Sequence, residues 1–183
     1  HGVAEKVKAD WIHLIDNVGI LGDSYLHHNG KPLVALWGFN RTYTTTPEAL
    51  SELIDWFHAK APEKYRASVK LGVFDNFYKD AAYAEAMKKA DVLSPWYVGR
   101  TETKAQYEAF RTESIAPAVA WCKEQDILFV PVIYPGFSWY NLRNGGNPQN
   151  RTPRDGGKYY WMQSHMNLEL GVESIYLAML DEV

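Results

Sequence analysis

Residues 127–134, ILFVPVIY, form an apolar, β-rich run that follows a stretch of helical periodicity over residues 103–125. The same alternation of strand and helix patterns recurs along the chain, which is typical of βα units around a parallel sheet. Strands are predicted over residues 32–37, 69–74, 92–97, 127–134 and 174–180, and helices over residues 5–18, 47–60, 81–90, 103–125 and 159–170. The first helix has an apolar face of Val7, Trp11, Leu14, Ile15 and Val18. Thr46 is predicted to cap the second helix and Gly171 to end the last. The pattern indicates about five strands in one domain spanning residues 1–183.

Five βα units fit either a doubly wound sheet or part of an eight-unit barrel. No Gly-x-Gly-x-x-Gly follows the first strand and no Walker sequence occurs, which removes the usual reason to favour a nucleotide-binding sheet. A complete barrel typically has about 250 residues, whereas this chain has 183. We therefore expect an α/β fold of the (β/α)8 TIM-barrel type, as a partial barrel, and a chain that is a fragment.

Charge and composition exclude several classes of partner. The formal net charge is −3, with acids and bases interspersed, so no nucleic-acid partner is expected. No apolar run approaches the roughly 18 residues of a membrane span, so membrane insertion is not expected. The single Cys122 is predicted to be a small core residue. His27 and His28 lie near Asp23 without metal-ligand spacing, so neither a metal nor a cofactor is predicted.

Aromatic residues make up 14% of the chain and recur at the predicted strand ends. Active sites of barrels lie at the C-terminal ends of strands, and flat rings there can stack on the apolar faces of sugars, although aromatic residues are also common in cores. The loop over residues 135–160 adds amide and guanidinium donors that suit sugar hydroxyls. The candidate saccharide-binding residues are Trp37, Trp96, Tyr134, Trp139, Tyr140, Arg143, Asn144 and Arg154.

Two adjacent carboxylates, Asp181 and Glu182, stand at the last predicted strand end, where only one of them can face a cleft. Glycoside cleavage generally needs two carboxyl groups, so a second acid must come from elsewhere. A serine hydrolase is disfavoured because no Gly-x-Ser-x-Gly occurs. Positional candidates for the second acid, each of which competes with a role as a helix cap or ion-pair partner, are Asp23, Asp75, Glu102 and Asp155.

Five stretches together resemble glycoside hydrolase family 99 and the bacterial relatives called family 71/99-like. They are NGKPLV at 29–34, LSPWYVGR at 93–100, YPGFSWYN at 134–141, PRDGGKYY at 153–160 and DEV at 181–183. The resemblance implies a retaining endo-α-mannosidase-like enzyme on a (β/α)8 barrel that acts on α-linked oligosaccharides or polysaccharides by a two-carboxylate mechanism. It also implies an extracellular or periplasmic location.

In the family, the first of two glutamates acts as a base on the sugar 2-hydroxyl, and Glu182 matches it, with Asp181 in place of the usual Asn. The second, the general acid and base, would lie beyond Val183, so the chain is expected to lack it. Phe137 stands where the family tends to have Tyr, which puts mannan specificity in question. The alternative is a non-catalytic carbohydrate-binding barrel domain that kept the aromatic cleft without the acid pair.

Overall fold

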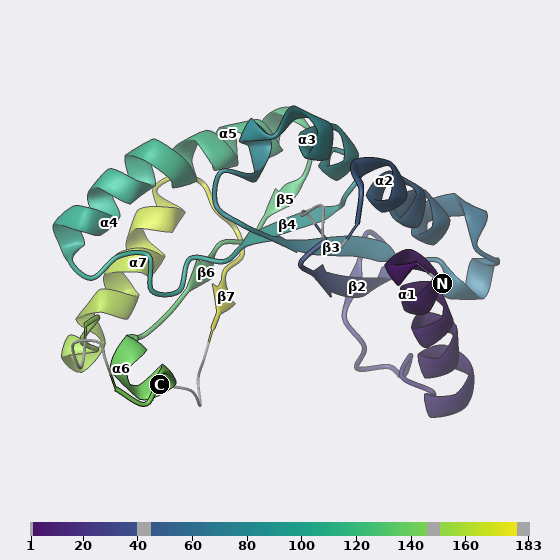
Figure 1. Ribbon diagram of the computed structural model, residues 1–183, viewed down its shortest axis with the longest axis horizontal. Coiled ribbons are helices and arrows are strands. Elements are labelled where there is room, and N and C mark those ends of the chain that lie inside the picture. Colours follow the sequence, from purple (N-terminus) through teal and green to yellow (C-terminus); the bar gives the residue numbers. More distant parts are fainter. Residues whose placement is uncertain (1, 40–44, 146–150, 179–183) are drawn as a thin grey trace. The chain divides into compact units, whose positions relative to one another are not determined.

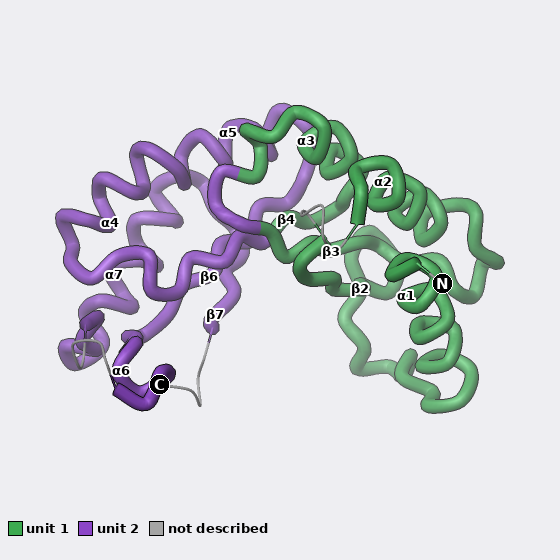
Figure 2. The backbone as a smooth tube through the Cα atoms, in the orientation of Figure 1, with its two compact units in different colours: residues 1–73, 77–93 green, residues 74–76, 94–183 purple. Residues whose placement is uncertain are grey.

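The computed structural model describes residues 2–39, 45–145 and 151–178 (Figure 1). Contacts within the chain group it into two compact units (Figure 2). Unit 1 comprises His1–Val73 and Phe77–Leu93, and unit 2 comprises Phe74–Asn76 and Ser94–Val183. The prediction of one domain over residues 1–183 stays a prediction.

Unit 1 is built on strands β1 (His27–His28), β2 (Lys31–Trp37) and β3 (Ser68–Val73), in that order. β1 and β2 are antiparallel, and the turn between them uses Asn29 and Gly30, which both have positive φ as a tight hairpin requires. β2 and β3 are parallel, with Leu33 opposite Ser68 and Trp37 opposite Gly72. Strand β4 (Val92–Pro95), which begins in unit 1, is the next neighbour of β3. The predicted strands at 32–37, 69–74 and 92–97 are thus confirmed.

The helices of unit 1 are α1 (Val3–His13), α2 (Pro47–Asp55) and α3 (Ala81–Met87), and wider helical turns extend α1 through Leu14–Val18 and α2 through Trp56–Lys60. The predicted cap of α2 is confirmed, because Thr46 Oγ1 accepts a hydrogen bond from the Ala49 N–H at 3.2 Å. Side chains of this helix are fully buried in the core of unit 1, at Leu50, Leu53, Ile54 and Phe57.

The apolar face predicted for the helix over residues 5–18 is only partly buried. Trp11 is 3% exposed, and its indole N–H donates to the Tyr65 carbonyl at 2.9 Å. Leu14 and Val18, in contrast, are 37% and 58% exposed. The helix therefore packs mainly through the turn that carries Trp11.

Unit 2 contains α4 (Lys104–Phe110), α5 (Ala116–Glu124), α6 (Trp139–Leu142) and α7 (Lys158–Leu168), with strands β5 (Leu128–Phe129), β6 (Val132–Ile133) and β7 (Tyr176–Leu177). β5 is the neighbour of β4, and β6 pairs in parallel with β7. The predicted helix over residues 103–125 is confirmed as a continuous helical stretch over 104–124. A wider helical turn at Arg111–Ile115 joins α4 to α5, and Pro117 lies in the first turn of α5. Gly171 has a φ of 78° and follows α7, as predicted for a helix end.

The predicted strand over residues 127–134 is in fact two short strands, β5 and β6, on either side of Pro131. Proline has no N–H to donate to a strand ladder, so it ends the pairing of β5. Its carbonyl still accepts a hydrogen bond from the Tyr176 N–H at 3.0 Å, which begins the pairing with β7. The last predicted strand, over residues 174–180, falls partly outside the described residues.

The core of unit 2 surrounds the C-terminal end of β6. It is formed by Val98, Val132, Tyr134, Phe137, Tyr159 and Ala178, with Trp96, Trp139 and Met162 packed against it. Cys122 is 1% exposed, and burial raises the pKa of its thiol to about 12, which agrees with the predicted core role. No helix within the described ranges is long and apolar enough to cross a membrane.

Candidate functional site

Two loops that follow strands in unit 2 pack directly against each other. One follows β4 and the other follows β6 and extends to the start of α7. Gly99, in the first loop, has a φ of 73°, and a Cβ atom there would lie 3.0 Å from two ring carbons of Phe137 and 3.3 Å from Nε1 of Trp139. Only glycine tolerates both this conformation and this approach. The contact joins two of the stretches that carry the family resemblance.

The long loop after β6 is closed at its base by a two-residue bridge. Phe137 and Thr152 exchange backbone hydrogen bonds at 3.0 and 3.1 Å. Gly136 lies beneath this bridge, and a Cβ atom there would lie 2.8 Å from the Thr152 carbonyl oxygen and 2.7 Å from Cγ of Arg154. Ser138 caps α6 by accepting a hydrogen bond from the Asn141 N–H at 3.3 Å. Residues 136–141 are therefore held in place by backbone contacts.

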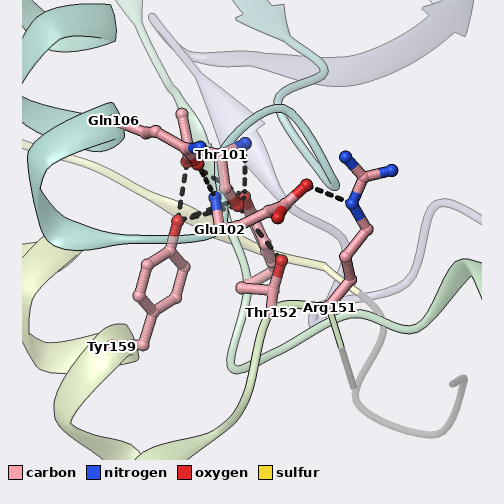
Figure 3. Close-up of polar contacts among 7 residues, drawn as sticks. Thr101, Glu102, Gln106, Arg151, Thr152 and Tyr159 are labelled. Atoms are coloured by element: carbon pink, nitrogen blue, oxygen red, sulfur yellow. Dashed lines mark hydrogen bonds and ion pairs between the residues drawn. The ribbon is translucent and has the colours of Figure 1, made fainter. Parts of the chain in front are cut away.

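Buried hydroxyl groups converge on the carbonyl of Thr101, in the loop after β4 (Figure 3). Tyr134 donates to it at 2.8 Å, Tyr159 at 3.0 Å and Thr152 at 3.1 Å. Burial raises the pKa of the Tyr159 hydroxyl, so this group stays protonated and able to donate. The hydrogen bonds connect the end of β6, the long loop and α7 to the loop after β4, and we call these four residues the Thr101 hub.

Gln163 extends the Thr101 hub along α7. Its side chain is fully buried, its Nε2 donates to the Tyr134 carbonyl at 2.7 Å and its Oε1 accepts from the Tyr134 N–H at 3.4 Å. The sequence reasoning missed both Thr101 and Gln163. A signal for Gln163 exists, because it lies four residues after Tyr159 on the helix face that also carries Met162 and Met166.

The structure places one predicted saccharide contact in the core. Tyr134 is 0% exposed, and its hydroxyl is engaged by the Thr101 hub. The side chain at this strand position points into unit 2 rather than toward solvent, so the structure does not support direct contact between Tyr134 and a sugar. Its role is to hold the strand-end loops together.

The remaining predicted contacts of unit 2 differ in accessibility. Tyr140 is 43% exposed, and Arg143, Asn144 and Arg154 are exposed, whereas Trp96 and Trp139 are partly buried against the core. The Trp139 ring meets Phe137 edge-on at 4.8 Å between ring centroids, and the Arg143 guanidinium carbon lies 4.7 Å from the centroid of the Trp139 ring. A cation–π contact therefore holds the Arg143 guanidinium group against the Trp139 ring.

Trp37 is the predicted contact that lies in unit 1. Its ring covers Gly72, the residue opposite it on β3, since a Cβ atom at Gly72 would lie 2.0 Å from two Trp37 ring atoms. The side chain is 41% exposed. One side of the ring is thus supported by backbone, which keeps an indole in a defined orientation at the end of β2.

Three positional candidates for an acid are engaged in ion pairs. Asp75 accepts from Arg100 at 2.6 Å, Glu102 pairs with Arg151 (Figure 3), and Asp155 lies 3.7 Å from the Lys158 ammonium group. The fourth candidate, Asp23, is exposed in unit 1. Asp181 and Glu182 lie outside the described residues. In the described part of the chain, no cluster of three or more His, Cys, Asp or Glu side chains is placed to hold a metal ion.

Two cavities in unit 2 adjoin these loops, and both fall within the range of about 300–1,000 Å³ that is typical of ligand pockets. The larger, of about 560 Å³, lies between the start of α4 and α7 and is lined by Glu102, Thr103, Lys104, Pro153, Asp155, Lys158, Tyr159, Met162, His165 and Met166. The smaller, of about 370 Å³, lies at the base of the long loop and is lined by Gly136, Phe137, Ser138, Asn141, Thr152, Pro153 and Arg154.

Comparisons with known proteins were made for families, curated proteins and solved structures. No protein-family model matches the chain, and no curated protein matches it. Two solved structures of the glycoside hydrolase family 99 endo-α-mannosidase from Bacteroides thetaiotaomicron are similar to it. One is a complex with bis-tris propane.

Each of the two structures matches 98% of this chain with a TM-score of 0.72 and 19% sequence identity. The chain spans about half of their length, 52% and 50% respectively. At 19% identity, the likeness establishes the fold alone. At the level of the fold, it confirms the resemblance to glycoside hydrolase family 99 that the sequence indicates. The chain therefore has an α/β fold with a mostly parallel sheet that matches part of the TIM barrel of glycoside hydrolase family 99.

Proposed function

We propose that this chain belongs to a glycoside hydrolase that acts on α-linked oligosaccharides or polysaccharides, in the manner of a retaining endo-α-mannosidase. The observation that carries the proposal is the match of 98% of the chain to endo-α-mannosidase structures. The arrangement of the strand-end loops in unit 2 supports it, because barrel enzymes build their active sites from such loops. An extracellular or periplasmic location is part of the same proposal.

The accessible residues of the two loops suit a saccharide. Trp96, Trp139 and Tyr140 supply rings for the apolar faces of sugars, and Arg143, Asn144 and Arg154 supply donors for their oxygen atoms. Trp37, in unit 1, is a separate candidate for stacking on a sugar, at the end of β2. The Thr101 hub holds these loops rigid, which is what a binding site needs in order to orient its ligand.

Glu182, with Asp181 beside it, is the proposed catalytic carboxylate. By analogy with the family, Glu182 takes the proton of the sugar 2-hydroxyl while that oxygen displaces the leaving group, and a second carboxylic acid protonates the departing oxygen. Water then opens the anhydro-sugar that results, with the second residue acting as base, and Glu182 returns its proton to the 2-oxygen. The second carboxylic acid is not assigned to any residue of this sequence.

A saccharide-binding protein without hydrolase activity is the second candidate. It is favoured by one observation: Asp75, Glu102 and Asp155, the candidates for a second acid in unit 2, are each paired with a cationic side chain. A carboxylate that is already engaged by a cationic side chain is less available to a substrate. Binding through the aromatic residues and arginines needs no acid.

Hydrolysis of α-mannan, α-glucan and α-xylan oligosaccharides by the protein expressed from the complete gene separates the two candidates. Cleavage that is lost in Glu182→Gln and retained in Asp181→Asn establishes the hydrolase and the role of Glu182. We expect a loss of about 10²-fold or more, as for removal of a general base. Binding without cleavage in the unmodified protein rejects the hydrolase and supports the second candidate.

A further inference from the structure

The loops after β4 and β6 carry an excess of positive charge, although the whole chain has a formal charge of −3. Residues 96–103 and 135–158 contain five basic residues and two acidic ones. The basic residues are Arg100, Arg143, Arg151, Arg154 and Lys158, and the acidic ones are Glu102 and Asp155. The excess does not depend on residues 146–150, whose side chains are all non-ionisable.

Three of these positive charges are neutralised by neighbours. Arg100 pairs with Asp75, Arg151 with Glu102, and Lys158 with Asp155. Arg143 and Arg154 make no ion pair with any residue in the described ranges. Within the described ranges, two exposed guanidinium groups on the same loop thus have no carboxylate partner.

Arg154 is held at the smaller cavity by its own side-chain stem. Its Cγ packs over Gly136, in the space that a Cβ atom at that position would occupy. Arg154 lines the cavity of about 370 Å³ together with Ser138 and Asn141. Arg143 follows α6 and is held over the Trp139 ring at 4.7 Å. Packing of both stems lowers the entropy lost when their N–H groups bind a ligand.

The chemistry of these two side chains favours a ligand group that accepts hydrogen bonds and has no hydrogen to donate. A guanidinium group has five N–H donors and no acceptor, whereas a sugar hydroxyl both donates and accepts. A neutral sugar therefore uses these arginines only in part. A carboxylate, sulfate or phosphate group accepts from the planar fork at two oxygens and neutralises its charge.

We propose that the cavity between Gly136 and Arg154 binds an anionic substituent of the saccharide, with Arg154 as its main ligand and Arg143 as a second positive charge. The substituent is a carboxylate, sulfate or phosphate group. This inference rests on the proposed function and defines its substrate class as an acidic α-linked saccharide.

The test compares neutral α-linked oligosaccharides with their uronate-, sulfate- and phosphate-bearing counterparts. Affinities are measured by calorimetry with the protein from the complete gene carrying Glu182→Gln, so that ligand is not consumed. The variants are Arg154→Gln, Arg154→Lys and Arg143→Gln. Lys123→Gln is the matched control, because it removes one positive charge from an exposed position at the C-terminal end of α5 in the same unit.

At least one acidic ligand is expected to bind about tenfold or more tightly than its neutral counterpart, a difference of about 1.4 kcal/mol. Arg154→Gln should remove this preference, Arg154→Lys should retain part of it, and Lys123→Gln should leave it unchanged. The preference should also shrink as salt is raised. The acidic counterpart that binds best identifies the anionic group.

Equal affinity for neutral and acidic ligands overturns the inference. An equal loss of affinity for neutral and acidic ligands in Arg154→Gln also overturns it. Such a result would mean that Arg154 binds sugar hydroxyl groups or pairs with a carboxylate of the protein itself. Hydrolysis of neutral substrates without any preference for charge rejects this inference and leaves the proposed function intact. Absence of both binding and hydrolysis rejects the two together.

Discussion

Gly99 is a position where a single methyl group should disturb the candidate site both by close contact and by backbone strain. Gly99→Ala places a Cβ atom 3.0 Å from two ring carbons of Phe137. Comfortable carbon contacts begin at about 3.5 Å, so the ring or the loop must move by about 0.5 Å or more. The same substitution also forces alanine into a left-handed conformation, since φ at this position is 73°.

The two costs can be separated with a second glycine. Gly171 has a φ of 78°, and nothing lies within 4 Å of the Cβ atom that alanine would introduce there. Gly171→Ala should therefore cost only the left-handed backbone strain, about 1–2 kcal/mol. Gly99→Ala should cost the same strain and a further 1–3 kcal/mol, roughly, for overpacking, which makes about 2–5 kcal/mol in all.

Urea unfolding followed by tryptophan fluorescence measures both variants. We expect the free energy of unfolding to fall further in Gly99→Ala than in Gly171→Ala by about 1–3 kcal/mol. Phe137→Leu, which shortens the ring side chain, should relieve part of this extra loss in the double variant. Equal losses in Gly99→Ala and Gly171→Ala, or strict additivity with Phe137→Leu, would refute the reasoning that the two loops are in close contact at Gly99.

Two further predictions concern hydrogen bonds in the two units. Tyr134→Phe should lower the free energy of unfolding by about 1–3 kcal/mol, because it deprives both the N–H and the carbonyl of Thr101 of a partner, whereas Tyr159→Phe should cost about 0.5–1.5 kcal/mol. Urea unfolding of both variants checks this order, and the reverse order contradicts it. Burial raises the pKa of Asp91, but hydrogen bonds, including one from His58 Nε2 at 2.7 Å, outweigh it and hold this pKa below its ordinary value. The stabilisation is therefore present above the unfolded pKa of about 3.9 and is lost as pH falls through the lower folded pKa. Asp91→Asn should thus cost about 1–2 kcal/mol at pH 7 and progressively less as the pH falls through that folded pKa. A cost that is independent of pH in parallel unfolding curves would exclude this role for Asp91.

Local patterns of the sequence were sufficient for most of the secondary structure. The strand and helix periods repeat over neighbouring residues, so β2, β3, β4 and all the helices of Figure 1 except α6 could be placed without knowledge of their partners. Thr46 was identifiable as a helix cap because a cap needs only the next three residues. The barrel type of the fold was also accessible, since it follows from the order of the elements and from the resemblance.

The candidate site could be predicted only in part, because strand ends do not reveal which side of a sheet a side chain faces. Tyr134 and Tyr140 look alike in sequence, yet one is fully buried and the other is 43% exposed. The ion pair of Asp75 with Arg100 could not be read from spacing either. Strand register and side-chain packing decide which residues are buried and which form ion pairs, and both depend on residues far away in the chain.

The sequence by itself determined the alternation of elements, the helix caps, the aromatic content of the strand ends and the likeness to family 99. Only the tertiary structure decided that Gly99 contacts Phe137 and that hydroxyl groups 33 to 58 residues away meet at Thr101. The physical reason is that periodicity and capping arise from bonds between near neighbours. Burial, ion pairing and cavity formation arise from segments that meet only when the chain has folded.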